Sequence, residues 1–273
     1  MGVAVKRAEP IDKREEDLMW SNGVLGDSSP QSLVDTMVYM CGYYFALRSG
    51  QEHRDLSFSQ LEIIERDGLK VLRYFENTSK NNPGGLKHRK IEPKVVEHSE
   101  NKNNPERCFV RFYQIYVSHC PPASKRTSDS FYLPPLKKKK DDIWFSGVPI
   151  GHNTLGKTVS RLCSMSGIKG FKTNHSLRVT AATRLFHAGV DEQLIMKRTG
   201  HRSIDGVRAY KRIADDQNRE ISDILNNENG PSKKRKIELD TCISEECTEI
   251  YSKTPFTLNI TNCNNVCIKM TKE

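Results

Sequence analysis

"TNHSLRVTAATRLFHAGVDEQLIMKRTGHRSIDGVRAYKRI", residues 173–213, combines a helical pattern with closely spaced histidines, arginines and a tyrosine. Its apolar residues recur at three- and four-residue intervals, and Gly189 and Gly200 are stop signals. The stretch therefore predicts helices over about 176–187 and 191–198. It also holds a His-x-x-Arg pair, a second histidine 26 residues after the first, and a tyrosine nine residues later. These residue types are compatible with a metal site, a basic surface helix or an active site that handles phosphate.

The charge of the chain is positive and unevenly distributed. The 273 residues carry a formal net charge of +9. Residues 237–273 hold six acidic residues and three lysines, a charge of −3, so the remainder carries +12. A basic body of this kind favours a polyanion partner, of which nucleic acid is the usual one. A basic protein without such a partner is the alternative.

The eight cysteines do not form the pattern of a disulfide framework or of a zinc site. Four of them lie in apolar stretches, where cysteine serves as a small buried hydrophobe. The other four are spaced five, sixteen and four residues apart, looser than the CxxC pairs typical of zinc sites. The eight are Cys41, Cys108, Cys120, Cys163, Cys242, Cys247, Cys263 and Cys267. We therefore expect no metal and no cofactor.

The cellular location is predicted from what the sequence lacks and from one basic cluster. It has no secretory signal and no apolar run long enough to span a bilayer, so we expect an intracellular protein without a membrane partner. The cluster PSKKRK at 231–236 follows a polar stretch and has the form that nuclear import receptors bind, which predicts the nucleus. A solvated linker is the alternative. A second run, residues 137–140, lies between prolines and aspartates and predicts an exposed loop.

Hydrophobic periodicity predicts a helix, then a small sheet. Residues 1–30 are polar and contain turn-forming residues. The helical period begins with Ser32 as the expected N-cap and should end near Arg48. Residues 61–65 and 70–75 read as strands joined by a turn at Asp67-Gly68.

The rest of the chain is predicted to be mainly helical. Residues 108–120 are compatible with a helix or a strand. A helix begins near Thr154, and a last helix runs from about Ser203 toward Leu225. The expected domain organisation is a polar N-terminal segment, a central domain, and a basic linker with a flexible tail, at residues 1–30, 31–225 and 226–273.

Six positions carry a resemblance to a known family. They are Arg48 in ALRSGQEHRDL, Lys80 in ENTSKNNPGGL, His175 and Arg178 in NHSLR, His201 in TGHRS, and Tyr210 in RAYKR. In kind and order they resemble the tyrosine recombinases (the phage-integrase family). Within that family, the sequences of these motifs are most similar to the eukaryotic Crypton elements and to the Crypton-derived domain of MYM-type zinc-finger proteins. The resemblance covers about residues 10–225. It implies an α+β fold, a mostly helical catalytic domain with a small antiparallel sheet of about three strands on one side.

The resemblance also implies a role for each position in DNA strand cleavage. Arg48 and Arg178 clamp the non-bridging phosphate oxygens, because guanidiniums bind them bidentately and stay protonated. His201 is a third donor. Tyr210 attacks phosphorus to form a 3′-phosphotyrosyl intermediate, and His175 assists as base.

The remaining position, Lys80, lies on a predicted hairpin turn, where it would protonate the leaving 5′-oxygen. The arginines supply the charge that a metal would otherwise provide. Taken singly, each of the six positions has a plainer interpretation, such as a helix-end cation, a solvated lysine or a core tyrosine. Their common order is what favours the active site.

Further basic residues are expected to contact the DNA backbone. They are Lys87, Arg89, Lys90, Arg184, Lys197, Arg198, Arg202, Arg208, Lys211 and Arg212. The expected partners are double-stranded DNA, further copies of the chain in a tetramer on two DNA sites if it is active, and nuclear proteins.

Three functions stay open at this point. The first is a site-specific recombinase or integrase that cleaves and rejoins DNA through Tyr210. The second is a domesticated Crypton-derived nuclear module that binds DNA or protein in transcription without catalysis. Residues 1–30 favour it, because they do not match the N-terminal helical domain with which the family grips the duplex. The third is a relative of the type IB topoisomerases, which share the chemistry.

Overall fold

The structure is a computed structural model that describes residues 7–76, 94–201, 203–211 and 215–226. The chain divides into two compact units, residues 1–218 and 219–273. The first unit contains the core and all the candidate site residues. In the second, only the C-terminal part of one helix and the residue after it are described.

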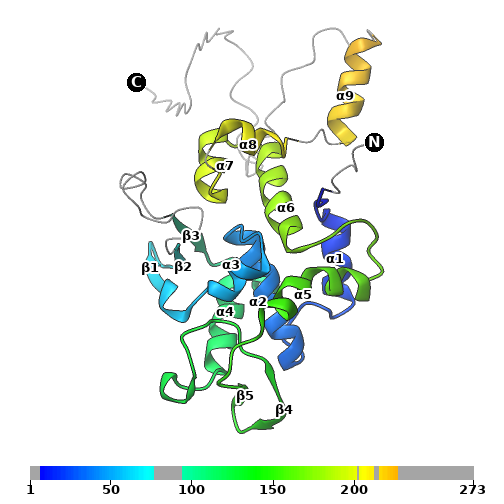
Figure 1. The fold of residues 1–273 in the computed structure, drawn as a ribbon. Coiled ribbons are helices and arrows are strands. Elements are labelled where there is room, and N and C mark those ends of the chain that lie inside the picture. Colours follow the sequence, from blue (N-terminus) through cyan, green and yellow to red (C-terminus); the bar gives the residue numbers. More distant parts are fainter. Residues whose placement is uncertain (1–6, 77–93, 202, 212–214, 227–273) are drawn as a thin grey trace, which may run out of the picture. The chain divides into compact units, whose positions relative to one another are not determined.

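The first unit is mostly helical, with a three-stranded sheet and a small hairpin (Figure 1). The described α-helices are α1 (Lys13–Ser21), α2 (Pro30–Tyr44), α3 (Gly50–Asp55), α4 (Phe109–Ser118), α5 (His152–Met165), α6 (Asn174–His187), α7 (Glu192–Thr199), α8 (Ile204–Arg208) and α9 (Asp215–Leu225), the last of which crosses into the second unit. The strands are β1 (Leu61–Arg66), β2 (Leu69–Phe75), β3 (Val95–Ser99), β4 (Pro135–Lys140) and β5 (Ile143–Phe145). None of the described helices has the length and apolar character needed to cross a membrane.

The sheet lies to one side of the helices and is antiparallel throughout, in the order β1-β2-β3 (Figure 1). Asp67 and Gly68 join β1 to β2 with φ angles of 52° and 70°. A two-residue turn with both φ angles positive matches the twist of a hairpin, which is why this dipeptide predicts one. The two strands predicted around it are confirmed. The β2–β3 connection lies outside the described residues.

The main core surrounds α2, which is apolar over most of its circumference. A helix of this kind is stable only when other elements cover it; α2 packs against α4, α5, α6 and β4. At its end, the Phe45 ring stacks on Tyr74 of β2 and lies 5.2 Å from that of Phe109 of α4. The central position of α2 therefore fixes where the chain after it begins.

A second, smaller hydrophobic cluster lies at the other end of α6. Ala182, Ile195 and Val207 are fully buried there, and the rings of Phe186 and Tyr210 pack against them. These residues come from the C-terminal half of α6, from α7, and from α8 and the residues just after it. Tyr210 is thus positioned by a different cluster from the one that positions Arg48.

Two sequence-based predictions about the first 45 residues are wrong in detail. Residues 1–30 are not simply a polar segment, because they include α1 and bury Ile11 and Met19 in the main core. The N-cap of α2 is Ser29 rather than Ser32, because the Ser29 hydroxyl accepts the Ser32 N–H and proline stands at the first helical position.

Three further differences concern irregular backbone that periodicity does not reveal. The helix expected to end near Arg48 ends at Tyr44. Residues 137–140, predicted to be a loop, lie in β4, which pairs with β5 across a turn at Asp141 with φ 54°. The single helix expected from 203 to 225 is described as α8 and α9, which are separate. Residues 108–120, left open as helix or strand, form α4.

The first residue of α3, Gly50, lies against the backbone of α5 at Gly156. A Cβ atom on Gly50 would lie 2.8 Å from the Gly156 Cα of α5, whereas a Cβ on Gly156 would meet only the Gly50 Cα, at 3.9 Å. We therefore predict that Gly50→Ala lowers the free energy of unfolding by about 1–3 kcal/mol through overpacking. The matched variant Gly156→Ala should raise it by about 0.5–1 kcal/mol, because alanine is the better helix residue. Urea denaturation of both variants checks the contrast, and equal effects would contradict it.

Candidate active site

Arg48 lies in a short irregular segment between two helices. Phe45 ends α2, Ala46 takes a left-handed φ of 58°, and Ser49 caps α3. The Glu52 carboxylate accepts hydrogen bonds from the Arg48 backbone N–H at 2.8 Å and from its Nε at 2.6 Å. The side chain is therefore oriented at its Nε, while its two terminal nitrogens are left for another anion.

Arg178 is the most deeply buried charge of the candidate set. It lies on α6, one turn after His175, and its relative exposure is 6%. Its Nη1 donates to the Ala46 carbonyl over a long 3.4 Å, and its buried Nε has no hydrogen-bond partner among the described residues. Burial lowers the pKa of Arg178, and the positive charge of Arg48 lowers it further. A buried, unpaired guanidinium is unfavourable unless it meets an anion.

His175 and Tyr210 meet across the site. The His175 Nε2 lies 3.0 Å from the Tyr210 hydroxyl oxygen. The Tyr210 carbonyl accepts a hydrogen bond from the Thr183 hydroxyl at 3.2 Å, which ties the nucleophile candidate to α6. Burial, followed by the charges of Arg178 and Arg48, lowers the pKa of His175. A neutral imidazole at this distance can accept the phenol proton.

His201 follows Gly200, which ends α7 with a left-handed φ of 69°. Its ring centroid lies 5.0 Å from that of Tyr210. Burial lowers the pKa of His201 to about 4, with further lowering by Arg178, His175, Arg48 and Lys94. The imidazole is therefore neutral at pH 7.

The neighbour of His201 decides which of its nitrogens carries the hydrogen. The Thr199 hydroxyl lies 2.6 Å from the Ile195 carbonyl and 2.6 Å from the His201 Nδ1. A hydroxyl has one hydrogen, and the carbonyl can only accept it. The His201 Nδ1–H must then donate to the Thr199 oxygen, so its Nε2 is an acceptor. The donor role predicted for His201 therefore requires that Nε2 gain a proton.

The structure brings five of the six candidates into one site. Arg48, Arg178, His175, His201 and Tyr210 come from the α2–α3 connection, from α6 and from the turns around α8. Their side chains contact each other or perturb each other's pKa values. The sixth, Lys80, lies outside the described residues.

Two further residues belong to the site and were missed from the sequence. Glu52, which holds Arg48, follows it by four residues, a spacing at which opposite charges pair on a helix; that was an available signal. Lys94, just before β3, lies against Gly200. Only the fold brings it there, because no motif links 94 to 200.

The basic residues predicted to contact DNA fall into three groups. Lys87, Arg89, Lys90, Arg202 and Arg212 lie outside the described residues. Lys197 and Lys211 are exposed. The remaining three have partners within the chain.

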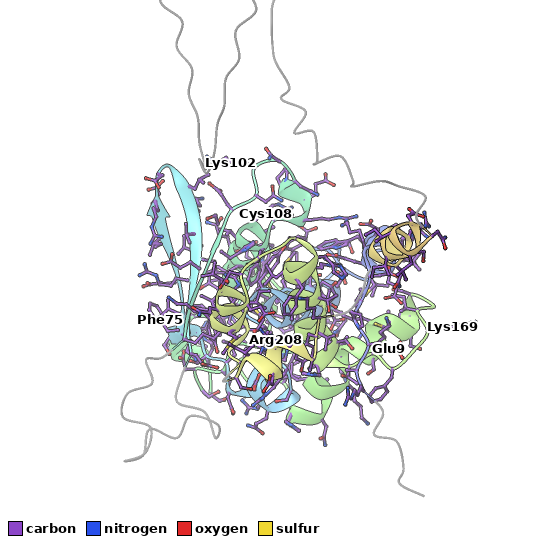
Figure 2. All side chains as sticks on the ribbon, turned by 90° about the horizontal axis from the view of Figure 1, so that it is seen from above. Glu9, Phe75, Lys102, Cys108, Lys169 and Arg208 are labelled. Carbon is purple, nitrogen blue, oxygen red and sulfur yellow. The ribbon has the colours of Figure 1, made fainter. Side chains whose placement is uncertain are left out.

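These three arginines differ in exposure and in how many of their hydrogen bonds lie within the chain. Arg208, which is labelled in Figure 2, lies at the end of α8 and is exposed. Its Nε donates to the Glu192 carboxylate at 2.7 Å. Arg198 is half-buried and donates to the Glu97 carbonyl at 2.7 Å. Arg184 pairs with Glu16 of α1 at 2.7 Å, and its remaining contacts are also internal, which indicates a structural role that its sequence context did not reveal.

No group of three or more histidine, cysteine or acidic side chains in the described residues could hold a metal ion. Cys41, Cys108, Cys120 and Cys163 are free thiols buried in the protein. The four cysteines of the tail lie outside the described part of the chain.

A family model described as "Domain of unknown function (DUF3504)" matches residues 11–164, more than half of the chain. The chain belongs to the DUF3504 family. The part of the chain that matches the DUF3504 model contains Arg48 and Glu52. His175, Arg178, His201 and Tyr210 follow it.

Curated relatives of the DUF3504 chain include zinc finger MYM-type proteins and a transcriptional regulator. Zinc finger MYM-type protein 2 of Homo sapiens is 31% identical over 178 residues, which cover 60% of this chain and 13% of that protein. Zinc finger MYM-type protein 3 of Homo sapiens is 29% identical over 168 residues, covering 56% and 12%. Transcriptional regulator QRICH1 of Homo sapiens is 28% identical over 156 residues, covering 54% and 20%. This chain thus spans a fifth or less of each relative.

Solved structures similar to the DUF3504 chain are site-specific recombinases. The XerH recombinase in its post-cleavage complex with a palindromic difH substrate superposes with a TM-score of 0.54 at 16% identity, over 82% of this chain and 55% of that one. The XerA recombinase gives 0.51 at 14%, over 85% and 67%. The predicted α+β fold of a tyrosine recombinase catalytic domain, with a small antiparallel sheet, is confirmed. The resemblance stated from the sequence, to the tyrosine recombinase fold and to MYM-type zinc-finger proteins, is confirmed.

The proton positions on His201 give a prediction for the free DUF3504 protein. Nitrogen NMR should show a neutral ring at pH 7 with its hydrogen on Nδ1, which takes up a proton only near pH 4. In the unfolded chain the pKa is about 6.5. The unfolded state then binds more protons between these values, so folding stability falls as the pH drops from about 6.5 to 4.

Thr199→Val is the matched control for this measurement, because it removes the acceptor of the Nδ1–H and keeps the side-chain volume. It should shift the hydrogen toward Nε2. A wild-type ring that carries its hydrogen on Nε2, or that titrates near pH 6.5, would contradict the assignment.

Proposed function

We propose that this chain binds duplex DNA and cleaves one strand through Tyr210, as a strand transferase of the site-specific recombinase type. The observation that carries the proposal is Arg178, a buried guanidinium whose Nε has no hydrogen-bond partner among the described residues and whose charge interacts with Arg48, His175 and Tyr210. A phosphodiester is an anion whose non-bridging oxygens match two guanidiniums. Metal-free phosphoryl transfer needs this positive charge, because the pentacoordinate transition state gathers charge on those oxygens.

The chemical step follows from the contacts around the phenol. The Tyr210 oxygen forms a bond to phosphorus as the bond from phosphorus to the 5′-oxygen breaks. The phenol proton passes to His175 Nε2, 3.0 Å away. The 5′-oxygen leaves and takes up a proton, and the 3′-phosphotyrosyl link keeps the bond energy for religation.

The proton for the leaving oxygen is assigned by resemblance to Lys80. The same proposal includes backbone contacts from Lys87, Arg89, Lys90, Lys197, Arg202, Arg208, Lys211 and Arg212, and, with its Glu97 bond retained, from Arg198. It also includes assembly of four copies on two DNA sites, DNA integration as the outcome, and residence in the nucleus. The names of the curated relatives support the last of these.

A second function, without catalysis, is supported by the same relatives. One of them is named a transcriptional regulator, and each is at least about five times longer than the matched segment. In this reading the domain is a Crypton-derived module that retains the phosphate site and contributes DNA or protein contacts to transcription. The two functions share binding of the phosphate and differ only at the covalent step.

The covalent step separates the two functions. We predict that the full chain, incubated with a nicked duplex that releases a short 5′-hydroxyl fragment, forms a protein–DNA adduct stable in detergent. Tyr210→Phe should abolish the adduct. Tyr43→Phe is the matched control, because its hydroxyl contacts Arg184 outside the site, and it should retain the adduct. Arg178→Met should lower the rate at least about hundredfold, as expected when a donor to the transition-state oxyanion is lost.

Duplex binding without any adduct would establish the non-catalytic module. An adduct that persists in Tyr210→Phe would contradict the assignment of the nucleophile. Pooled genomic fragments in the same assay would report the target sequence. Relaxation of supercoiled plasmid by the single chain would instead indicate the topoisomerase-like reaction.

Binding of the phosphate should be coupled to a proton. Burial, and after it the neighbouring positive charges, hold the pKa of His201 near 4. The anion would offset those charges, and a counter-charge at contact distance raises such a pKa by about 1–3 units. We predict uptake of up to about one proton per site when duplex binds at about pH 5.5. Calorimetry in buffers of different ionisation enthalpy measures the uptake. It should be lost in His201→Gln, and equal uptake in the two proteins would contradict the coupling.

A further inference from the structure

The turn that presents Arg48 is held by two cations from outside it. The Lys94 Nζ donates to the Phe45 carbonyl at 2.6 Å, and the Arg178 Nη1 donates to the next carbonyl, that of Ala46. A cation is favourable at the end of α2, where carbonyls lack helical partners. Ala46 is in the left-handed region, which is unfavourable for an alanine. The surroundings must therefore hold this turn, and Lys94 is one of its supports.

The same lysine lies close to the turn that presents His201. A Cβ atom on Gly200 would lie 3.6 Å from the Lys94 Cδ and 3.9 Å from its Nζ. The positive charge of Lys94 contributes to the lowered pKa of His201. Lys94 therefore lies between the two turns that carry Arg48 and His201, one belonging to the main core and the other to the small cluster of α7 and α8.

The backbone of Lys94 is fixed on the sheet. Its carbonyl accepts a hydrogen bond from the Glu76 N–H at 2.8 Å, which continues the β2–β3 ladder by one pair. Three residues later, the Glu97 carbonyl accepts the Arg198 guanidinium of α7. The start of β3 is thus attached to both halves of the site.

We propose that Lys94 is a positioning residue of the phosphate site, which ties the Arg48 turn to the His201 turn and adds a fixed positive charge between them. The proposal rests on the function proposed above. It assigns Lys94 a task different from that of Lys80, because one Lys94 N–H is committed to the Phe45 carbonyl.

The charged groups around Lys94 come from every element that packs against it. Glu76 after β2 and Glu52 of α3 favour its protonated form, while Arg178 of α6 and Arg198 of α7 disfavour it. Burial is the largest effect and lowers the pKa of Lys94 to about 8. The charge is therefore present below about pH 8 and lost above it, unlike that of an arginine.

The first test uses the free protein and needs no reaction. In Lys94→Met the His201 pKa, followed by NMR, should rise above its wild-type value of about 4, because one nearby positive charge is gone. Lys94→Arg should leave it close to wild type. The matched control is Lys102→Met. Lys102 also donates to a backbone carbonyl, that of Gly68, but at the opposite end of the sheet from Phe75 (Figure 2). A His201 pKa that is unchanged in Lys94→Met would overturn the proposal.

The second test measures the rate of the Tyr210 adduct on the nicked duplex. Lys94→Met should slow adduct formation by about tenfold to hundredfold, the usual effect of misplaced catalytic groups, with a smaller change in duplex affinity. Lys94→Arg should restore most of that rate. The ratio of the Lys94→Arg rate to the wild-type rate should increase above about pH 8, because only the wild type loses this charge. This ratio compares Lys94→Arg with the wild type, so it can be measured even if Lys94→Met does not fold.

The outcomes distinguish the two proposals. If the wild type forms no adduct, the proposed reaction fails, and the His201 pKa still decides whether Lys94 acts on the site. If the wild type forms the adduct but Lys94→Met forms it equally fast, or the Lys94→Arg ratio does not change with pH, Lys94 has no positioning role. Reduced stability alone, with neither the pKa nor the pH profile changed, also overturns the proposal.

Discussion

The site depends on the absence of an ion pair at Arg178 among the described residues. Its guanidinium is buried, its one protein contact is a 3.4 Å hydrogen bond to a carbonyl, and its Nε is unpaired among the described residues. Elsewhere in the described chain, Arg184 and Arg161 each meet a carboxylate. Glu52 and Glu76 favour the charged form of Arg178 from a distance, but no carboxylate of the described residues forms an ion pair with it. A buried guanidinium without such a partner is costly, so this site is prepared for an anion from outside.

The fold places this arginine where two hydrophobic clusters meet. The main core, built around α2, delivers Arg48 through the turn at Ala46. The small cluster of α7 and α8 delivers His201 and Tyr210. Helix α6 belongs to both and carries His175 and Arg178, so it is the rigid connection between them. Hydrogen bonds from Lys94 to the Phe45 carbonyl and from Arg198 to the Glu97 carbonyl join residues 94–97 to both clusters. They help to set the distance between the Arg48 turn and the His201 turn.

The sequence predicted those parts of the site that depend on local spacing. His175 and Arg178 are three residues apart on a helix and therefore share a face, and Asp67-Gly68 specifies its own hairpin. The contribution of Lys94 could not be predicted, because it depends on how the start of β3 packs against the end of α7. The Thr199–His201 contact is local, but it requires the left-handed turn at Gly200. Arg184 illustrates the reverse case. The sequence predicts that it contacts DNA, but it pairs with Glu16 of α1, which lies in a segment that the sequence predicted to be polar. The sequence shows that a residue is charged, but only the fold shows which group it pairs with.

The most direct test of the account is where a phosphate-like anion binds. Crystals of the protein soaked with tungstate should give an anomalous peak between the Arg48 and Arg178 guanidiniums, within reach of the Tyr210 hydroxyl and of a protonated His201. Arg178→Met crystals, treated identically, should show no peak there. An empty site in the wild type, with Arg178 paired to a carboxylate of the chain, would contradict the central claim.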